Sequence, residues 1–233
     1  MVHWWKKLTF KDLDAVAEYL TPVRYFEDFS GYCRLRHRGL RSLALDALGR
    51  FIEAASKWEP ARQRQLALWL ARVSSRRQAP DHLCPVPLQQ FAVKVCTQWA
   101  EDVEDARPHC VLGIMTGADE AFKRALELDP GLDFARAACL RRYVQLLSWA
   151  AGWLPEHFYG IPEEVLADTY AGFALIEGFV KPKAYTSLIE DFYALRATTE
   201  AYRQTLIAKG HQSYWSPYIR IQRERSPGSD DFD

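Results

Sequence analysis

The sequence lacks long apolar runs, an alternating strand pattern and the short motifs of common enzymes. None of its 233 residues lie in a run approaching the 18 or more apolar residues of a membrane helix, so we expect no membrane span. No segment alternates apolar and polar residues between hairpin turns, which argues against a sheet. Phosphate-binding glycine loops, a His-Glu-x-x-His motif and a Gly-x-Ser-x-Gly motif are also missing. We therefore expect a non-enzymatic protein; a helical enzyme built on scattered residues remains the alternative.

Cysteines are few and have no framework spacing. Their odd number predicts reduced, partly buried thiols rather than a disulfide scaffold. The five are Cys33, Cys84, Cys96, Cys110 and Cys139. The segment from Met1 to Lys7 lacks the order of a secretory signal, so we expect a cytoplasmic protein.

One group of residues resembles a metal site in composition. It consists of His82, Cys84, Cys96, His109 and Cys110. Zinc needs four converging ligands, usually offered as close pairs, and these spacings match no common zinc module. We expect capping or core roles for these side chains, and neither a metal nor another cofactor.

Helical periodicity dominates the rest of the chain and predicts an all-α multi-helix array or bundle. One predicted helix has its apolar residues at 3.6-residue spacing: Leu43, Ala47, Leu48, Phe51, Ile52 and Ala55. Pro60 suits the first position of the next helix, whose inner face would hold Leu66, Trp69, Leu70 and Val73. Among the tryptophans, Trp58, Trp69, Trp99 and Trp149 lie among core-spaced apolar residues.

Caps and prolines predict further helix ends. Thr9-x-x-Asp12 resembles a capping box before a short helix. Residues 133–153 are expected to form a long helix that pairs with residues 118–128, with Ala121 or Ala125 at the contact. Pro162 and Pro182 stand at first helical positions, and Gly210 would end the longest helix.

Proline-rich residues 79–87 cannot be helical and give the best internal boundary. We expect an N-terminal helical part at 1–78 and a second helical part at 86–210, which together form one compact domain. The polar, turn-rich residues 226–233 are expected to be a disordered tail.

The stretch from Gly117 to Arg136 combines a helical pattern with the helix stop Asp129-Pro130-Gly131. Small and apolar residues recur within it at Ala118, Phe122, Ala125 and Leu126. This stretch resembles the second helix and exit turn of a tetratricopeptide (TPR) repeat. Leu112-Gly113 resembles the Leu-Gly pair of the first TPR helix, shortened by about two turns. The resemblance covers residues 108–136 and implies a protein-binding scaffold; an ordinary helical hairpin is the alternative.

A second resemblance involves the segment from Asp133 through Trp153 to Pro155-Glu156, followed by Ile161-Pro162-Glu163-Glu164. This order is similar to that of uncharacterised bacterial helical proteins, some of which resemble the immunity partners of secreted toxins. The resemblance implies an immunity or antitoxin-like protein that binds a toxin, and it carries no catalytic residues.

Charge is unevenly distributed although the net charge is zero. Residues 1–80 hold 15 Lys and Arg against 8 Asp and Glu, whereas residues 81–178 hold 7 against 15. The acidic middle would suit a basic protein partner such as a toxin domain. It would equally complement the basic first part within the fold. Its proposed binding residues are Glu101, Asp102, Glu104 and Asp105, which end a predicted helix where the dipole disfavours them.

Two other regions are candidate binding sites. The basic run Arg34–Arg41, with Tyr25, Phe26, Phe29 and Tyr32 before it, could bind a phosphate backbone and stack bases. A nucleic-acid-associated regulator is therefore an alternative, although whole-chain neutrality argues against a dedicated nucleic-acid binder.

Aromatic residues near the chain ends could anchor a protein partner or dock on the chain's own helices. These are Trp4, Trp5 and Trp215.

Overall fold

A computed structural model describes residues 12–75, 82–152, 154 and 158–208 of the chain. Its regular elements are all helices, with no strand in these residues, which confirms the all-α class. The chain divides into two compact units, Met1–Ala135 and Arg136–Asp233. The boundary predicted at 79–87 lies inside the first unit.

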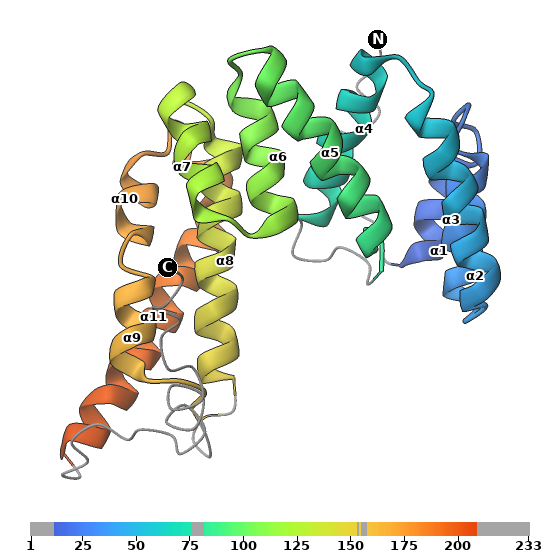
Figure 1. Ribbon diagram of the computed structural model, residues 1–233. Coiled ribbons are helices and arrows are strands. Elements are labelled where there is room, and N and C mark those ends of the chain that lie inside the picture. The colour runs from blue at the N-terminus through green and yellow to red at the C-terminus, as the bar shows by residue number, and fades with distance from the viewer. Residues whose placement is uncertain (1–11, 76–81, 153, 155–157, 209–233) are drawn as a thin grey trace, which may run out of the picture. The chain divides into compact units, whose positions relative to one another are not determined.

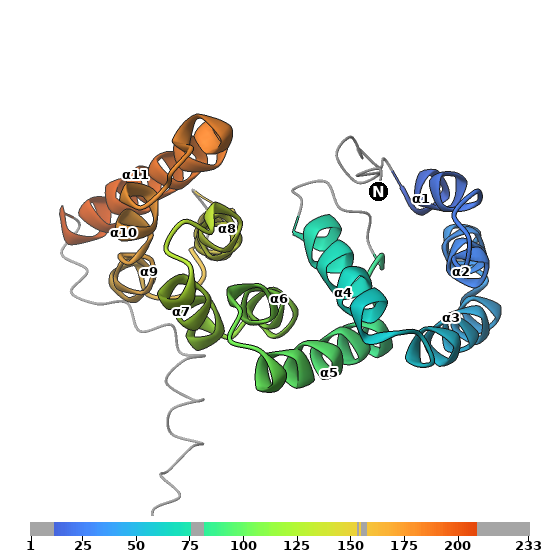
Figure 2. The same cartoon turned by 90° about the horizontal axis from the view of Figure 1, so that it is seen from above.

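The first unit consists of consecutive helices that lie side by side (Figures 1 and 2). Their bounds are α1 (Leu13–Leu20), α2 (Glu27–His37), α3 (Arg41–Ser56), α4 (Pro60–Ser74), α5 (Val86–Asp102), α6 (Ala106–Thr116) and α7 (Asp119–Leu128). α2 packs between α1 and α3, while α4 packs on α5, α5 on α6 and α6 on α7. α5 also contacts α3, and α6 also contacts α4.

Local sequence explains where the first helices begin and end. The Asp12 carboxylate accepts the N–H of Ala15 at 2.9 Å and so caps α1. The predicted capping box placed the cap at Thr9, which lies outside the described residues. α2 ends in a left-handed turn at Gly39, with φ of +78°, and the N–H of Leu40 reaches back to the Leu35 carbonyl at 2.9 Å. Pro60 is the first residue of α4, as predicted.

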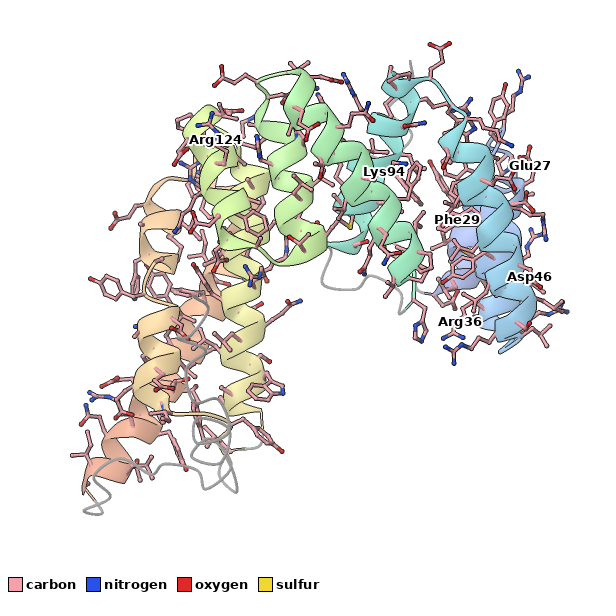
Figure 3. The ribbon with its side chains drawn as sticks, viewed as in Figure 1. Glu27, Phe29, Arg36, Asp46, Lys94 and Arg124 are labelled. Atoms are coloured by element: carbon pink, nitrogen blue, oxygen red, sulfur yellow. The ribbon has the colours of Figure 1, made fainter. Side chains whose placement is uncertain are left out.

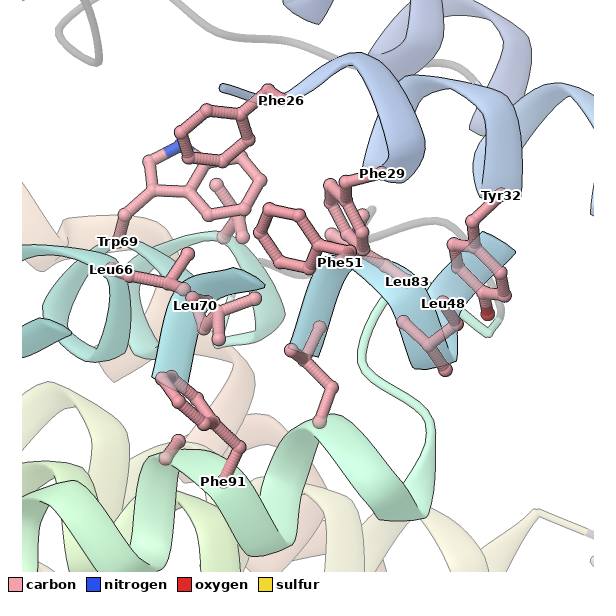
Figure 4. Close-up of a cluster of buried hydrophobic side chains, with 14 of the residues drawn as sticks. Phe26, Phe29, Tyr32, Leu48, Phe51, Leu66, Trp69, Leu70, Leu83 and Phe91 are labelled. Carbon is pink, nitrogen blue, oxygen red and sulfur yellow. The ribbon is translucent and has the colours of Figure 1, made fainter. Parts of the chain in front are cut away.

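An aromatic cluster forms the centre of the first unit (Figure 4). The Phe29 ring centroid lies 5.0 Å from that of Phe51 and 6.0 Å from that of Trp69. Phe26, just before α2, lies 5.5 Å from Phe51 and 5.9 Å from Trp69. Each such side chain contributes about 1.5–3 kcal/mol when fully buried. The four rings therefore connect α2, α3 and α4 through one set of contacts.

α6 and α7 pack closely because Gly113 has no side chain. A Cβ atom at Gly113 would lie 2.9 Å from three ring atoms of the buried Phe122. Ala125 of α7 packs with Cys110 of α6 and with Ala135. α6 is thus a close partner of α7. The sequence predicted residues 133–153 as the partner, and Ala135 of that range shares a buried cluster with Ala125. Of that range, only residues 133–135 belong to the first unit.

The second unit is built around α8, most of which lies in it, and α11. The bounds are α8 (Asp133–Ala151), α9 (Pro162–Asp168), α10 (Gly172–Glu177), a 3₁₀ helix η2 (Pro182–Tyr185) and α11 (Thr186–Ala208). Its core joins Leu140 and Leu147 of α8 to Phe192 of α11. α11 packs on α9 and on η2.

Arg196 of α11 connects three elements of the second unit. Its Nη1 donates to the Leu166 carbonyl near the end of α9 and to the Thr169 hydroxyl, both at 2.7 Å. Thr169 is fully buried and donates in turn to the Val165 carbonyl at 2.8 Å. The Arg196 guanidinium carbon also lies 4.8 Å from the centroid of the Phe173 ring of α10.

Three predicted features differ in the structure. Leu43 is 55% exposed, since the buried stripe of α3 begins at Ala44. Trp149 is 61% exposed because it lies on the opposite side of α8 from the buried Leu147. Pro182 opens η2, and the longest helix begins only at Thr186. The predicted stop at Gly210 and the tail at 226–233 lie outside the described residues.

We expect Gly113→Ala to lower the free energy of unfolding. The added methyl group would force the Phe122 ring away, and overpacking costs about 1–3 kcal/mol, against about 0.5–1 kcal/mol gained by removing a helical glycine. Gly49→Ala is the control, because a Cβ at helical Gly49 meets no atom within 4 Å. Urea unfolding should show a lower midpoint for the first variant and a higher one for the second. Equal shifts would contradict the tight α6–α7 contact.

We expect Arg196→Met to destabilise the second unit by about 1–3 kcal/mol, because it leaves the buried Thr169 hydroxyl and the Leu166 carbonyl without this donor. Arg203→Met is the matched control on α11. Arg203 forms a partly exposed ion pair with the nearby Glu200, at 2.7 Å, and its loss should lower the unfolding midpoint less. Comparable losses from the two variants would show that the Arg196 hydrogen bonds add little.

Candidate protein-binding surface

The predicted acidic residues lie at the end of α5 and in the connection to α6. We call Glu101–Asp105 the acidic turn. Asp105 is the N-cap of α6, and its Oδ1 accepts the N–H of Arg107 at 2.9 Å. The Arg107 Nε donates to both carboxylate oxygens of Asp105, at 3.0 and 2.9 Å. Asp105 therefore stabilises the start of a helix, and its side chain is only 14% exposed.

Trp99, in the last turn of α5, supports the acidic turn from beneath. Its ring is almost fully buried, and the guanidinium carbons of Arg64 and Arg107 lie 5.3 and 5.1 Å from its centroid. Arg64 comes from α4 and donates to the Asp102 carboxylate at 3.0 Å. Two arginines held against one ring thus each bind a carboxylate of the turn.

The outer residues of the acidic turn face solvent. Glu104 pairs with Arg124 of α7 at 3.2 Å but remains 76% exposed (Figure 3 labels Arg124). Arg124 also pairs with Glu127 at 3.1 Å. Glu101 is exposed, and so is the apolar side chain of Val103, at 45%. The turn therefore offers carboxylates on either side of an exposed apolar residue.

The surface stays acidic after these ion pairs are counted. Residues 101–127 hold seven Asp and Glu residues against three Lys and Arg residues, and Arg64 adds one further positive charge. Exposed ion pairs are weak, so their carboxylates remain available to a second cation. A surface of this charge attracts cationic groups over several ångströms.

The surroundings of Asp105 lower the pKa of its carboxyl group. Burial raises its pKa, but hydrogen bonds from the Arg107 side chain and backbone, together with the Arg107 charge, hold the pKa below its usual value. Asp105 thus stays ionised in the folded protein under mildly acidic conditions. The charge of Asp105 strengthens both the N-cap of α6 and the ion pair with Arg107.

The metal-like residues do not converge in the structure. No group of three or more His, Cys, Asp or Glu side chains that could hold a metal ion occurs in the described residues. Cys96 and Cys110 are buried, and burial raises the pKa of each thiol to about 12. Cys84 is partly buried with its pKa raised to about 11 by burial, and its Sγ lies 4.0 Å from the Met115 Sδ. None of the five cysteines, all of which lie in the described residues, forms a disulfide, in agreement with the prediction of reduced thiols.

The other predicted binding sites are the tryptophans near the chain ends and the aromatic residues before Arg34–Arg41. Trp4, Trp5 and Trp215 lie outside the described residues. Of the aromatic residues before Arg34–Arg41, Phe26, Phe29 and Tyr32 are buried in the core and cannot stack on bases. Only Tyr25 is exposed.

Sequence reasoning did not anticipate Arg64 and Arg124 as part of the site. They stand 38 and 20 residues from the carboxylates with which they pair. The only signal for Arg64 and Arg124 in the sequence is the helical periodicity of α4 and α7, which shows the face of its helix on which each arginine lies.

Comparison with known protein families, with curated proteins and with solved structures finds no match to this chain. In the described part of the chain, no helix is both long and apolar enough to cross a membrane.

We expect Asp105→Ala to lower the free energy of unfolding by about 1 kcal/mol through loss of the helix cap. Asp105→Asn keeps a capping oxygen but removes the charge. Because the folded pKa of Asp105 lies below the unfolded value of about 3.9, its charge stabilises the fold above that pH and less as pH falls through the folded pKa. The difference between the urea unfolding midpoints of wild type and Asp105→Asn should therefore become smaller as the pH is lowered from 7. A constant difference between them would contradict this role.

Proposed function

We propose that this chain is a non-enzymatic protein-binding module, and that the acidic turn binds a basic surface of its partner. The observation that carries the proposal is the arrangement of exposed Glu101 and Glu104 around the exposed Val103. A buried apolar centre with a charged rim is the usual composition of a specific protein interface.

The arginines beneath the turn favour binding by fixing its shape. Arg64 and Arg107 lie against the Trp99 ring and bind Asp102 and Asp105, so the turn needs little ordering when a partner arrives. Interfaces gain affinity when such ordering costs are already met in the free protein.

The narrower form of the proposal is an immunity or antitoxin-like protein that neutralises a toxin by occluding its active site. It rests on the resemblance of residues 133–164 to bacterial helical proteins of that kind and on the acidic surface. Occlusion requires complementary shape and charge and no catalytic group. A cationic active site, as in an enzyme that acts on nucleic acid, is the kind of toxin surface that the acidic turn would fit.

Charge reversal tests the proposal once a partner has been captured and purified. We expect Glu101→Lys, Asp102→Lys and Glu104→Lys together to slow association about tenfold or more at low salt, because steering by opposite charge is lost. Asp105 is kept, since it caps α6. Stopped-flow rates at several salt concentrations measure the effect, which should shrink as salt screens the charges.

The matched control reverses three exposed carboxylates elsewhere in the first unit. These are Glu18→Lys, Asp46→Lys and Glu53→Lys (Asp46 is labelled in Figure 3). The control changes net charge equally and should leave association much faster than the acidic-turn variant does. Equal slowing by both triple variants, with folding verified by circular dichroism, would show that overall charge rather than the acidic turn governs binding.

A further inference from the structure

A second surface cluster in the first unit combines two arginines with two aromatic rings. The guanidinium carbon of Arg62 lies 3.8 Å from the Tyr25 ring centroid and 4.4 Å from that of Trp58. The guanidinium carbon of Arg24 lies 4.6 Å from the same Tyr25 centroid. These residues come from the α1–α2 connection, the α3–α4 connection and the first turn of α4. Three separate segments therefore build the cluster.

The backbone holds Tyr25 in a conformation that L-residues rarely adopt. Its φ is +76°, and the N–H of Phe26 donates to the Val23 carbonyl at 3.1 Å, which closes a tight turn over Arg24 and Tyr25. Glycine is favoured at such a position. A tyrosine in left-handed conformation persists only where its surroundings fix it, and such residues cluster at functional sites. Here the ring is 40% exposed.

The rings beneath the arginines are anchored in the core. Trp58 lies 6.0 Å from Phe26 and 5.8 Å from Phe51, centroid to centroid, and 6.3 Å from Tyr25. Because Phe26 and Phe51 are buried, core packing holds the Trp58 ring beneath Arg62. A guanidinium stacked on such rings keeps its N–H edge directed away from the ring faces.

Neither arginine is neutralised by a carboxylate in the described part of the chain. Arg62 donates only to the Arg24 carbonyl, at 3.4 Å, which occupies one of its five N–H donors. Glu27 and Glu59 are the acidic residues nearest in sequence, and neither forms an ion pair with Arg24 or Arg62. Arg62 also stands in the first turn of α4, where the positive end of the helix dipole favours an anion.

We propose that Arg24, Tyr25 and Arg62 form a binding site for the phosphate group of a small-molecule monoester. Two guanidinium forks match the oxygens of a phosphate dianion and balance its charge. The guanidinium carbons of Arg24 and Arg62 both lie against the Tyr25 ring, at 4.6 and 3.8 Å from its centroid. The distance between these two carbons is therefore at most the sum of those two values. The Tyr25 side chain is 40% exposed, and its exposed edge can contact an aromatic group of the ester. The site is separate from the acidic turn and does not depend on the proposed protein-binding role.

Titration calorimetry with inorganic phosphate, phenyl phosphate and phenol tests the site on the full chain. We expect both phosphates to bind at one site and phenol not to bind. Arg24→Gln and Arg62→Gln should each weaken phosphate binding about tenfold or more, since each removes charged hydrogen bonds. Tighter binding of phenyl phosphate than of inorganic phosphate would identify an aromatic ester as the ligand class; equal binding would identify the phosphate group alone as the determinant.

Arg38→Gln is the matched control, because Arg38 is an exposed arginine in the same unit. It should leave phosphate affinity unchanged. Arg62→Lys keeps the charge without the planar fork and should bind phosphate with intermediate affinity. Tyr25→Gly suits the turn but removes the ring, and should also weaken binding. The proposal is overturned if folded wild-type protein binds no phosphate, or if Arg38→Gln weakens binding as much as Arg62→Gln does.

Discussion

The first unit depends on the packing of four aromatic rings, Phe26, Phe29, Phe51 and Trp69. Isolated helices as short as α1 and α2 are marginal in water, so they gain stability mainly from tertiary contacts. These rings supply such contacts between α2, α3 and α4, and small residues at the helix contacts, such as Ala47 and Ala55, let the helices approach. The turns, caps and surface clusters of this unit are positioned by that packing.

The aromatic core extends to the surface through Trp58 and there fixes charged groups. Trp58 touches Phe26 and Phe51 on its inner side and Arg62 on its outer side. Trp99 acts similarly beneath Arg64 and Arg107. Functional groups held by packed side chains keep a defined geometry, whereas the same groups on a free loop would not. The two candidate sites of the first unit share this construction although one is acidic and the other basic.

The helical class and several helix positions could be predicted because they depend on local pattern. The periodic apolar residues of α4, those of α3 apart from Leu43, and the prolines that open α4 and α9 were confirmed. α2 was not predicted, because its basic second half obscured the buried Phe29, Tyr32 and Cys33, which stand at helical spacing. Leu43 and Trp149 fit an apolar period but are exposed, since periodicity does not tell where the neighbouring helix ends.

The acidic turn shows how a local pattern can mislead about a site. From the sequence alone, Glu101–Asp105 stand at the end of a predicted helix, where the helix dipole disfavours carboxylates. Helix stability alone therefore does not explain the cluster. The structure places a new helix directly after it, so that Asp105 occupies a favourable helix start. Asp102 and Glu104 meet arginines distant in sequence, which no local pattern encodes. A stabilising role therefore accounts for Asp105 and part of Asp102. The turn also holds exposed carboxylates at Glu101 and at Glu104, which stays 76% exposed despite its pairing with Arg124.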